Sequence, residues 1–446
     1  MSRQAVGRAV RANALCASAA AAGSVTLAWL GLTGFAWSDY EVEARPALAA
    51  LVHGHLAEFL RLAPAYGGSL VLRAPFVALV DLWGGGELAV YRMAALPCLL
   101  AAAAFAVWLL AQMRRAGRPR LARGVALALC VANPLTLNAL EVGHPEELLG
   151  GVLCVAAVLA ADRERPLWAG VLLGAAIANK DWALVAVGPV LLALPARRAL
   201  CLSTAAGVAG AVLAPPALVH AGGFVTASAA TAVPSSAIFQ PWQVWWFLGH
   251  HGPVVHGMFG RVLADYRTGP GWVGDVSHPL IVVVGLPLSA VAWWRRERSR
   301  RGADVVPGAG RRAPTDTGAG TSPRVREPLL LLALLLLVRC MLDTWDDEYY
   351  LLPFVLALTT WEALGESGLP ALALGGVALA WLDWEWLPQH GGPDLEAAVF
   401  LLWTLPLAAG LALRLYASRW SGDPAGRLGR PRAELGRRWP APRTAR

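Results

Sequence analysis

Long apolar runs alternate with short polar connections over most of the chain. Runs of about 18 or more apolar residues recur, and a helix of that length crosses the roughly 30 Å of hydrocarbon in a bilayer. A chain built in this way is a polytopic membrane protein. Its apolar runs predict about twelve spans, at 14–36, 88–112, 124–141, 146–161, 167–179, 181–195, 200–219, 277–294, 328–343, 348–364, 369–386 and 397–416.

Two connections between the predicted spans are long, residues 38–87 and 220–276. In the first, residues 45–62 place leucine, valine and phenylalanine at helical spacing with polar residues between them, which predicts a helix lying in the membrane interface. Residues 66–86 are apolar but short, with Pro75 inside, and predict a second interfacial or re-entrant element. We therefore expect an all-α transmembrane helical bundle with a long first extracytoplasmic loop that bears interfacial helices.

Arginine carries nearly all of the positive charge, since Lys180 is the only lysine among 38 basic residues. Thirty of the 37 arginines fall in six connecting segments. Positively charged residues gather on the cytoplasmic side of membrane proteins, so this split predicts an integral multi-pass protein with both termini in the cytoplasm. The net charge of +8 is explained by topology, and we expect no nucleic acid partner. The six segments are the N-terminus, 113–123, 162–166, 196–199, 295–327 and the C-terminal tail.

Two of these arginine-rich segments are aperiodic. Residues 295–327 are rich in Gly, Pro, Ala and Arg, which predicts a disordered cytoplasmic loop. Residues 418–446 predict a basic disordered cytoplasmic tail for the same reason. Residues 1–417 are then expected to form one transmembrane domain.

Ionisable residues gather at the predicted outer ends of the spans. Ionisable groups at membrane depth are costly, which makes them candidates for function. The groups are Asp39, Glu41 and Glu43 after the first span; Glu141, His144, Glu146 and Glu147 between the third and fourth; Lys180 and Asp181 between the fifth and sixth; and Arg339, Asp343, Asp346, Asp347 and Glu348 between the ninth and tenth.

Structural explanations exist for several of these residues. Asp39 could be a solvated acid or a cap at a helix end, and Glu146 and Glu147 suit the positive end of a helix dipole. Lys180 could pair with a carboxylate of a neighbouring span. Arg339 could pair with Asp343, which follows one helical turn later.

The passage "LDTWDDEYYLLPF" (342–354) packs acids and two tyrosines into one short outer turn. Carbohydrate-facing surfaces use such residues, because acids accept hydrogen bonds from hydroxyl groups and aromatic rings stack on sugars; a plain polar turn has the same composition. The sequence contains no Walker A loop, no GxGxxG after a strand, no HExxH and no Cys/His metal spacing. We therefore expect no metal and no cofactor.

Three passages together resemble the membrane-integrated glycosyltransferases of the GT-C class. More narrowly, they are similar to the glycosyltransferase 87 group of polyprenol-phosphate-mannose-dependent mannosyltransferases. The passages are "SDYEVEARPALAALVHGH" (38–55), the stretch 143–195 from "GHPEELLGG" through "WAGVLLGAAIANKDW", and "LDTWDDEYYLLPFVLAL" (342–358). One departure is Pro145, since that group often has Asn at this place in the turn and so an amide contact is missing here.

The resemblance implies a GT-C-like enzyme that moves one sugar, mannose by the family pattern, from a polyprenyl-phosphate donor to a glycolipid or polysaccharide acceptor. The enzyme would lie in the plasma membrane with an extracytoplasmic active site, and its partners would be the donor, the acceptor and membrane lipid. A transporter or flippase of lipid-linked saccharides is the alternative, and it predicts ionisable residues in mid-span. The implied roles are Asp39 as catalytic base, with Glu41 or Glu43 as alternatives; Lys180, Arg339 and His144 at the donor phosphate; and Glu141, Asp181, Asp343, Asp346 and Tyr349 at the sugar or acceptor.

Overall fold

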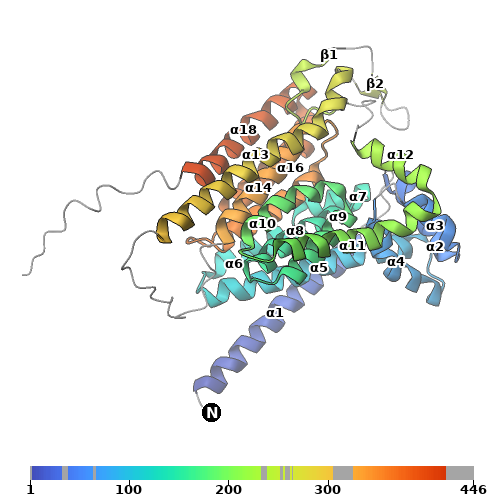
Figure 1. The fold of residues 1–446 in the computed structure, drawn as a ribbon. Helices are drawn as coiled ribbons and strands as arrows, with labels where there is room; N and C mark the ends of the chain where they lie inside the picture. The colour runs from blue at the N-terminus through green and yellow to red at the C-terminus, as the bar shows by residue number, and fades with distance from the viewer. Residues whose placement is uncertain are drawn as a thin grey trace, which may run out of the picture.

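A computed structural model of the chain is almost entirely helical (Figure 1). It describes residues 3–32, 39–63, 67–232, 239–251, 255–256, 262–263, 265–304 and 325–417. The helices of the bundle are α1 (Arg3–Leu32), α5 (Glu87–Arg115), α6 (Arg120–Val131), α7 (Pro134–Val142), α8 (Glu146–Asp162), α9 (Pro166–Asn179), α10 (Val187–Ala193), α11 (Arg198–Val219), α13 (Gly271–Asp304), α14 (Arg326–Leu342), α15 (Leu352–Ala363), α16 (Ala371–Trp381) and α18 (Pro393–Ala417). The predicted tail, 418–446, lies outside the described residues.

Local sequence signals set several helix ends. Asn133 caps α7, and its side-chain oxygen accepts a hydrogen bond from the backbone N–H of Leu135 at 3.1 Å. Pro134 and Pro166 begin α7 and α9, where a missing N–H costs nothing. Short turns complete the path as η4 (Asp181–Ala186), η8 (Glu348–Leu351), η9 (Leu382–Trp386) and α17 (Leu387–His390).

Five helices in the described part of the chain are long and apolar enough to cross a membrane. This supports an all-α, membrane-type fold, but not the expected number of about twelve spans. The centre of the bundle is made by α8, α14 and α15, which pack on one another and are apolar on all sides, as core helices are. The five are Glu87–Arg115, Arg120–Val142, Arg198–Val219, Gly271–Arg298 and Pro393–Ala417.

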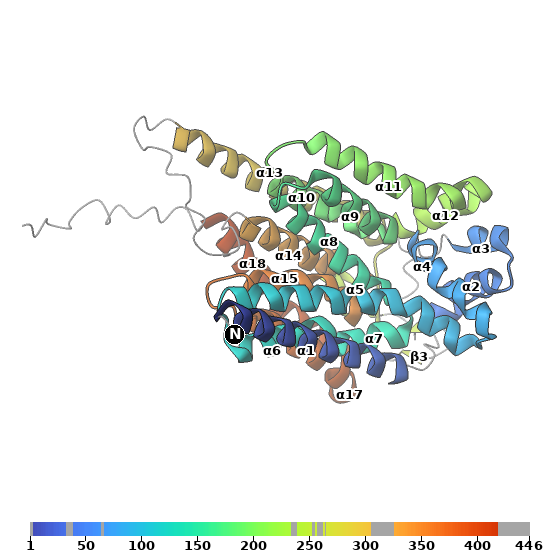
Figure 2. The same ribbon diagram turned by 90° about the horizontal axis from the view of Figure 1, so that it is seen from below.

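The first connecting segment, which lies between α1 and α5, is folded into short helices at one end of the bundle (Figure 2). The helix expected over 45–62 is interrupted, because Gly54 adopts a left-handed φ of 75° and ends the first half. The segment has its own apolar core around Leu48, Phe59 and Leu70. Its elements are η1 (Tyr40–Ala44), α2 (Arg45–Val52), α3 (Leu56–Leu62), α4 (Ser69–Val77) and η3 (Ala78–Trp83).

The second long connection holds more structure than expected. Strand β1 pairs antiparallel with β4, and β2 with β3. Helix α13 starts at Gly271 and continues to Asp304, so the first part of the loop predicted as disordered over 295–327 is helical, and residues 305–324 of it lie outside the described residues. The elements are α12 (Ala221–Ala232), η5 (Trp246–Leu248), β1 (His250–His251), β2 (Val255–His256), β3 (Val262–Leu263) and β4 (Arg267–Thr268).

Candidate active site

The turn between α7 and α8 brings distant residues together. Helix α7 ends at Val142 and is followed by Gly143, whose φ of 108° lies in the left-handed region. A Cβ at this position would lie 2.6 Å from Tyr40 Cβ, so only glycine lets the turn approach the start of the first connecting segment so closely. Asp39 immediately precedes Tyr40, and His144 immediately follows Gly143. The close approach therefore places Asp39 beside His144.

His144 is held between two carboxylates. Its Nε2 lies 2.9 Å from Asp39 Oδ2, and its Nδ1 lies 2.7 Å from Glu146 Oε1. Burial and the charge of Lys180 lower the pKa of His144, but Glu146 and Asp39 outweigh them and raise it to about 9. At neutral pH the ring is therefore an imidazolium, and it donates a hydrogen bond to each carboxylate. One face of the ring stacks on Tyr349, with ring centroids 4.8 Å apart.

Lys180 bridges the two glutamates that begin α8. Its Nζ lies 3.3 Å from Glu146 Oε1 and 3.3 Å from Glu147 Oε1. Burial lowers the pKa of Lys180, but Glu147 and Glu146 more than compensate and raise it. Trp182 Nε1 donates a further hydrogen bond of 3.0 Å to Glu147. The ion pair with a neighbouring helix, considered as the structural explanation for Lys180, is thus present.

Two arginines complete the group. Arg73 of α4 lies 3.3 Å from Glu146 Oε2 and also donates to Ser69 Oγ at 2.7 Å. Arg339 of α14 lies 3.5 Å from Glu147 Oε2. Each fully buried glutamate therefore faces two or more cationic side chains. We name the seven side chains the charge cluster: Asp39, Arg73, His144, Glu146, Glu147, Lys180 and Arg339.

The charge cluster is expensive to bury. Removing several ions from water costs more than their attraction reliably returns, so buried ion networks are weak evidence for stability alone. Networks with strongly perturbed pKa values are enriched at functional sites. The helix dipole accounts for glutamates at the start of α8, but it does not account for four cations around them. The charge cluster is therefore our candidate active site.

Arg339 and Asp343 do not form the pair considered from their spacing. Asp343 follows the last residue of α14 in an extended conformation, with ψ of 137°. Its Oδ1 lies 3.2 Å from His278 Nε2 and accepts the N–H of Trp345 at 3.0 Å. The guanidinium of Arg339 is directed instead to Glu147.

The two alternative bases in the first connecting segment, Glu41 and Glu43, differ in their surroundings. Glu41 pairs at the surface with Arg45, which also contacts Glu87. Glu43 is half-buried, and its pKa is raised mainly by burial while the charge of His144 opposes the shift. Glu43 is thus electrostatically coupled to the charge cluster, whereas Glu41 is held by surface partners.

The remaining predicted site residues divide by exposure. Glu141 and Asp181 are exposed. Asp346 is fully buried, neither of its carboxylate oxygens accepts a hydrogen bond from the described part of the chain, and burial raises its pKa well above the usual value. Burial and the charge of Asp39 raise the pKa of Asp347 to about 7, and burial and Glu385 raise that of Glu348 to about 8. We name residues 343–349, between α14 and α15, the late turn. It thus places acids that hold a proton near neutral pH beside the charge cluster.

One comparison with known proteins decides the family. The model of glycosyltransferase family 87 matches residues 68–307, which is more than half of the chain. The chain belongs to glycosyltransferase family 87. No curated protein and no solved structure matches it. The resemblance inferred from the sequence is therefore confirmed, and with it a glycosyltransferase function.

The part of this family 87 protein that the family model matches contains most of the charge cluster. Arg73, His144, both glutamates of α8 and Lys180 lie inside it, whereas Asp39 and Arg339 lie outside. Sequence reasoning missed Arg73 as a candidate. The signal was available, because Arg73 is one of only seven arginines outside the six arginine-rich segments, as Arg339 is.

Proposed function

We propose that this family 87 glycosyltransferase transfers one mannose from a polyprenyl-phosphate donor to a glycolipid or polysaccharide acceptor at the outer face of the plasma membrane. The observation that carries the proposal is the 2.9 Å contact between Asp39 and His144 inside a buried cluster that also holds Lys180. A candidate base and a candidate phosphate ligand are thereby linked through two side chains. The sequence contains no nucleotide-binding motif, which is consistent with a donor that carries its sugar on a lipid phosphate.

In the proposed reaction Asp39 acts as general base. It takes the proton of an acceptor hydroxyl while the oxygen attacks C1 of the sugar in line, and the bond from C1 to the phosphate oxygen breaks. The electron pair of that bond leaves with the polyprenyl phosphate, and the configuration at C1 inverts. His144 fixes one oxygen of Asp39 through Nε2–H, so the other oxygen is the one that would receive the proton.

Lys180 is the best placed cation for the donor phosphate. Its side chain is 18% exposed, against 3% for Arg73 and 5% for Arg339. The two arginines would stabilise the phosphate indirectly, by holding the glutamates and by their long-range positive charge, whereas the ammonium of Lys180 can contact a ligand directly. Both ring nitrogens of His144 are engaged, so we reassign His144 from a phosphate contact to a residue that positions Asp39.

The late turn would receive the sugar. Tyr349 stacks on His144 and is buried next to the proposed base. Asp346 has carboxylate oxygens without partners among the described residues, and sugar hydroxyls are suitable donors for them. Asp343 is already engaged by His278 and would act by holding the turn. The exposed Glu141 and Asp181 would lie toward the acceptor.

The test uses the purified full-length protein in nanodiscs, radiolabelled polyprenyl-phosphate-mannose and a panel of glycolipid acceptors. Asp39→Asn should lower turnover by about 10²-fold or more, because it removes the base while keeping the shape. Asp81→Asn is the matched control, since Asp81 is an exposed acid in the same connecting segment. Turnover that survives in Asp39→Asn would remove Asp39 as base, and loss in Glu43→Gln alone would assign that role to Glu43. Lipid translocation without turnover of any lipid-linked sugar would favour a flippase.

A further inference from the structure

Helix α8 connects the charge cluster to the opposite end of the bundle. It begins at Glu146 and ends at Asp162, and its 17 residues extend about 25 Å. This length approaches the thickness of the hydrocarbon core of a bilayer. A groove of about 270 Å³ lies at the far end of α8, remote from the charge cluster.

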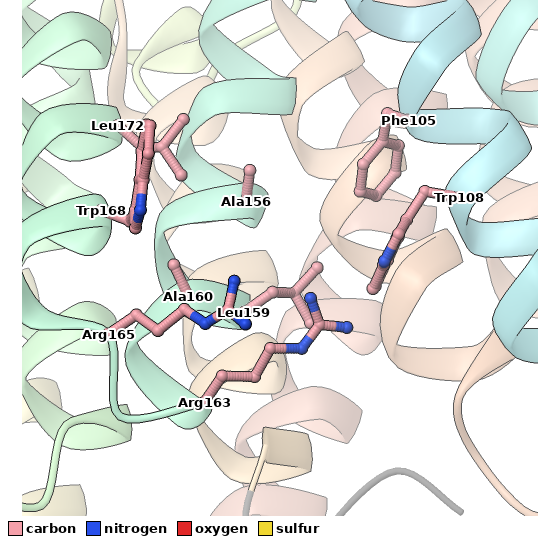
Figure 3. Close-up of a pocket in the computed structure, with 9 residues that line it drawn as sticks. All are labelled: Phe105, Trp108, Ala156, Leu159, Ala160, Arg163, Arg165, Trp168 and Leu172. Carbon is pink, nitrogen blue, oxygen red and sulfur yellow. The ribbon is translucent and has the colours of Figure 1, made fainter. Parts of the chain in front are cut away.

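The groove has aromatic walls and a floor of small residues (Figure 3). Helix α5 provides Phe105 and Trp108 on one side, and α9 provides Trp168 on the other. Between them Ala156 and Ala160 of α8 form the floor, and their short side chains leave the space that the groove occupies. Trp168 is 60% exposed, so its wall faces the surroundings of the bundle. These surroundings are apolar if the bundle crosses a membrane.

Two arginines close one end of the groove. Arg163 and Arg165 lie in the turn between α8 and α9, and both side chains extend along its lower end in Figure 3. The Arg163 guanidinium lies 5.0 Å from the ring centroid of Trp108. Burial, and then the positive charge of Arg165, lower the pKa of Arg163, with Asp162 acting in the opposite sense. In the part of the chain that the structure describes, no ion pair joins either arginine to a carboxylate.

We propose that this groove binds an anionic phospholipid from the leaflet on the arginine-rich side of the bundle. The lipid phosphate lies against Arg163 and Arg165, and one acyl chain lies between the aromatic walls over Ala156 and Ala160. Planar guanidinium groups match phosphate oxygens, and basic pockets between transmembrane helices bind anionic headgroups. The occupant follows from charge complementarity, because an apolar groove that ends in two positive charges suits an amphiphile with an anionic head. This site is separate from the transferase chemistry and does not depend on it.

The test is native mass spectrometry of the full-length protein in detergent, titrated with phosphatidylglycerol, with phosphatidylcholine of the same acyl chains and with inorganic phosphate. Phosphatidylglycerol should bind about tenfold or more tightly than phosphatidylcholine. The double variant Arg163→Gln/Arg165→Gln should lose this preference. Arg120→Gln is the control, because Arg120 begins α6 at the same end of the bundle and does not line the groove.

A second variant fills the groove without altering charge. Ala156→Leu should weaken phosphatidylglycerol binding severalfold, whereas Ala104→Leu, an exposed position on α5, should not. If the arginine double variant fails to fold, comparing Ala156→Leu with Ala104→Leu still tests whether the lipid binds in the groove. The proposal is overturned if both lipids bind equally, if the variants retain wild-type binding, if inorganic phosphate binds and the lipid does not, or if polyprenyl phosphate displaces phosphatidylglycerol at lower concentration.

Discussion

His144 offers a sharp test of the charge cluster, because its protonation is coupled to folding. The pKa of about 9 compares with an ordinary value of 6.5. At about 1.36 kcal/mol per pKa unit, the folded protein favours the protonated ring by about 3 kcal/mol. A raised pKa means that this stabilisation is complete below pH 6.5 and is lost as the pH rises through 9.

The perturbation is His144→Asn, which removes the titrating group and keeps a polar side chain. The assay is the thermal denaturation midpoint of the purified protein at pH 6, 7, 8, 9 and 10. The wild-type midpoint should fall by on the order of 5 °C between pH 7 and 10, whereas the variant should start lower and change little over that range. His55→Asn is the matched control, because His55 is exposed on the first connecting segment.

Other groups titrate near this range, and the difference between wild type and variant separates them from His144. The raised pKa values of Asp347, about 7, and Glu348, about 8, make stability fall as the pH rises from about 4 to those values. Both effects are nearly complete below pH 9. The effect of Glu348 is common to the two proteins, whereas the charge of His144 lowers the pKa of Asp347, so the variant moves that titration to higher pH. A wild-type midpoint that is flat from pH 7 to 10, or a variant with the same slope, would refute the assignment of His144 as a buried imidazolium.

Two further substitutions test how the charge cluster is assembled. Gly143→Ala should lower the free energy of unfolding by on the order of 3 kcal/mol, because the new Cβ would lie 2.6 Å from Tyr40 Cβ. Gly54→Ala is the control: Gly54 also has a left-handed φ, of 75°, but open space around it, so the substitution should cost only about 1 kcal/mol. Equal effects of the two substitutions in a denaturation assay would contradict the close-approach argument. Arg73→Met should lower the free energy of unfolding by about 3–5 kcal/mol, because it leaves the buried charge of Glu146 poorly compensated. Arg73→Lys keeps a positive charge and should lose less stability than Arg73→Met. An Arg73→Met protein as stable as wild type would show that the contact with Glu146 has no energetic role.

Apolar runs were enough to predict where most helices of the bundle form. Each predicted span corresponds to a helix or helical pair in the structure, because runs of Ala, Leu and Val separated by Pro and Gly leave few other possibilities. The number of full crossings could not be obtained in this way. Helices α8 and α14 have 17 residues each and α15 has 12, so these core helices are shorter than a full span although their sequences are as apolar as one.

The candidate residues were found by their position at the ends of predicted spans, and Lys180 also by its rarity, but their partners were not found. The sole lysine and the histidine in the turn after α7 both belong to the charge cluster. Asp39 and His144 are 105 positions apart, and their contact depends on a glycine turn that packs against a short π-helical turn, which no periodicity shows. The i,i+4 pair of Arg339 and Asp343 was a wrong alternative, because the helix ends before Asp343 and the spacing rule applies only inside a helix.

The charge cluster is not electrically balanced by itself. With His144 protonated it contains four cations and three carboxylates, an excess of one positive charge. A sugar phosphodiester carries one negative charge, so the proposed donor would complete neutrality when it binds. Transfer of the sugar leaves a phosphate monoester with about −1.5 to −2 charge at pH 7. Because Asp39 has taken the acceptor proton by then, the charge cluster carries two excess positive charges, which match the new phosphate. The spent lipid becomes over-charged for these surroundings only when Asp39 gives up that proton, so the departure of the lipid would be coupled to the deprotonation of the base.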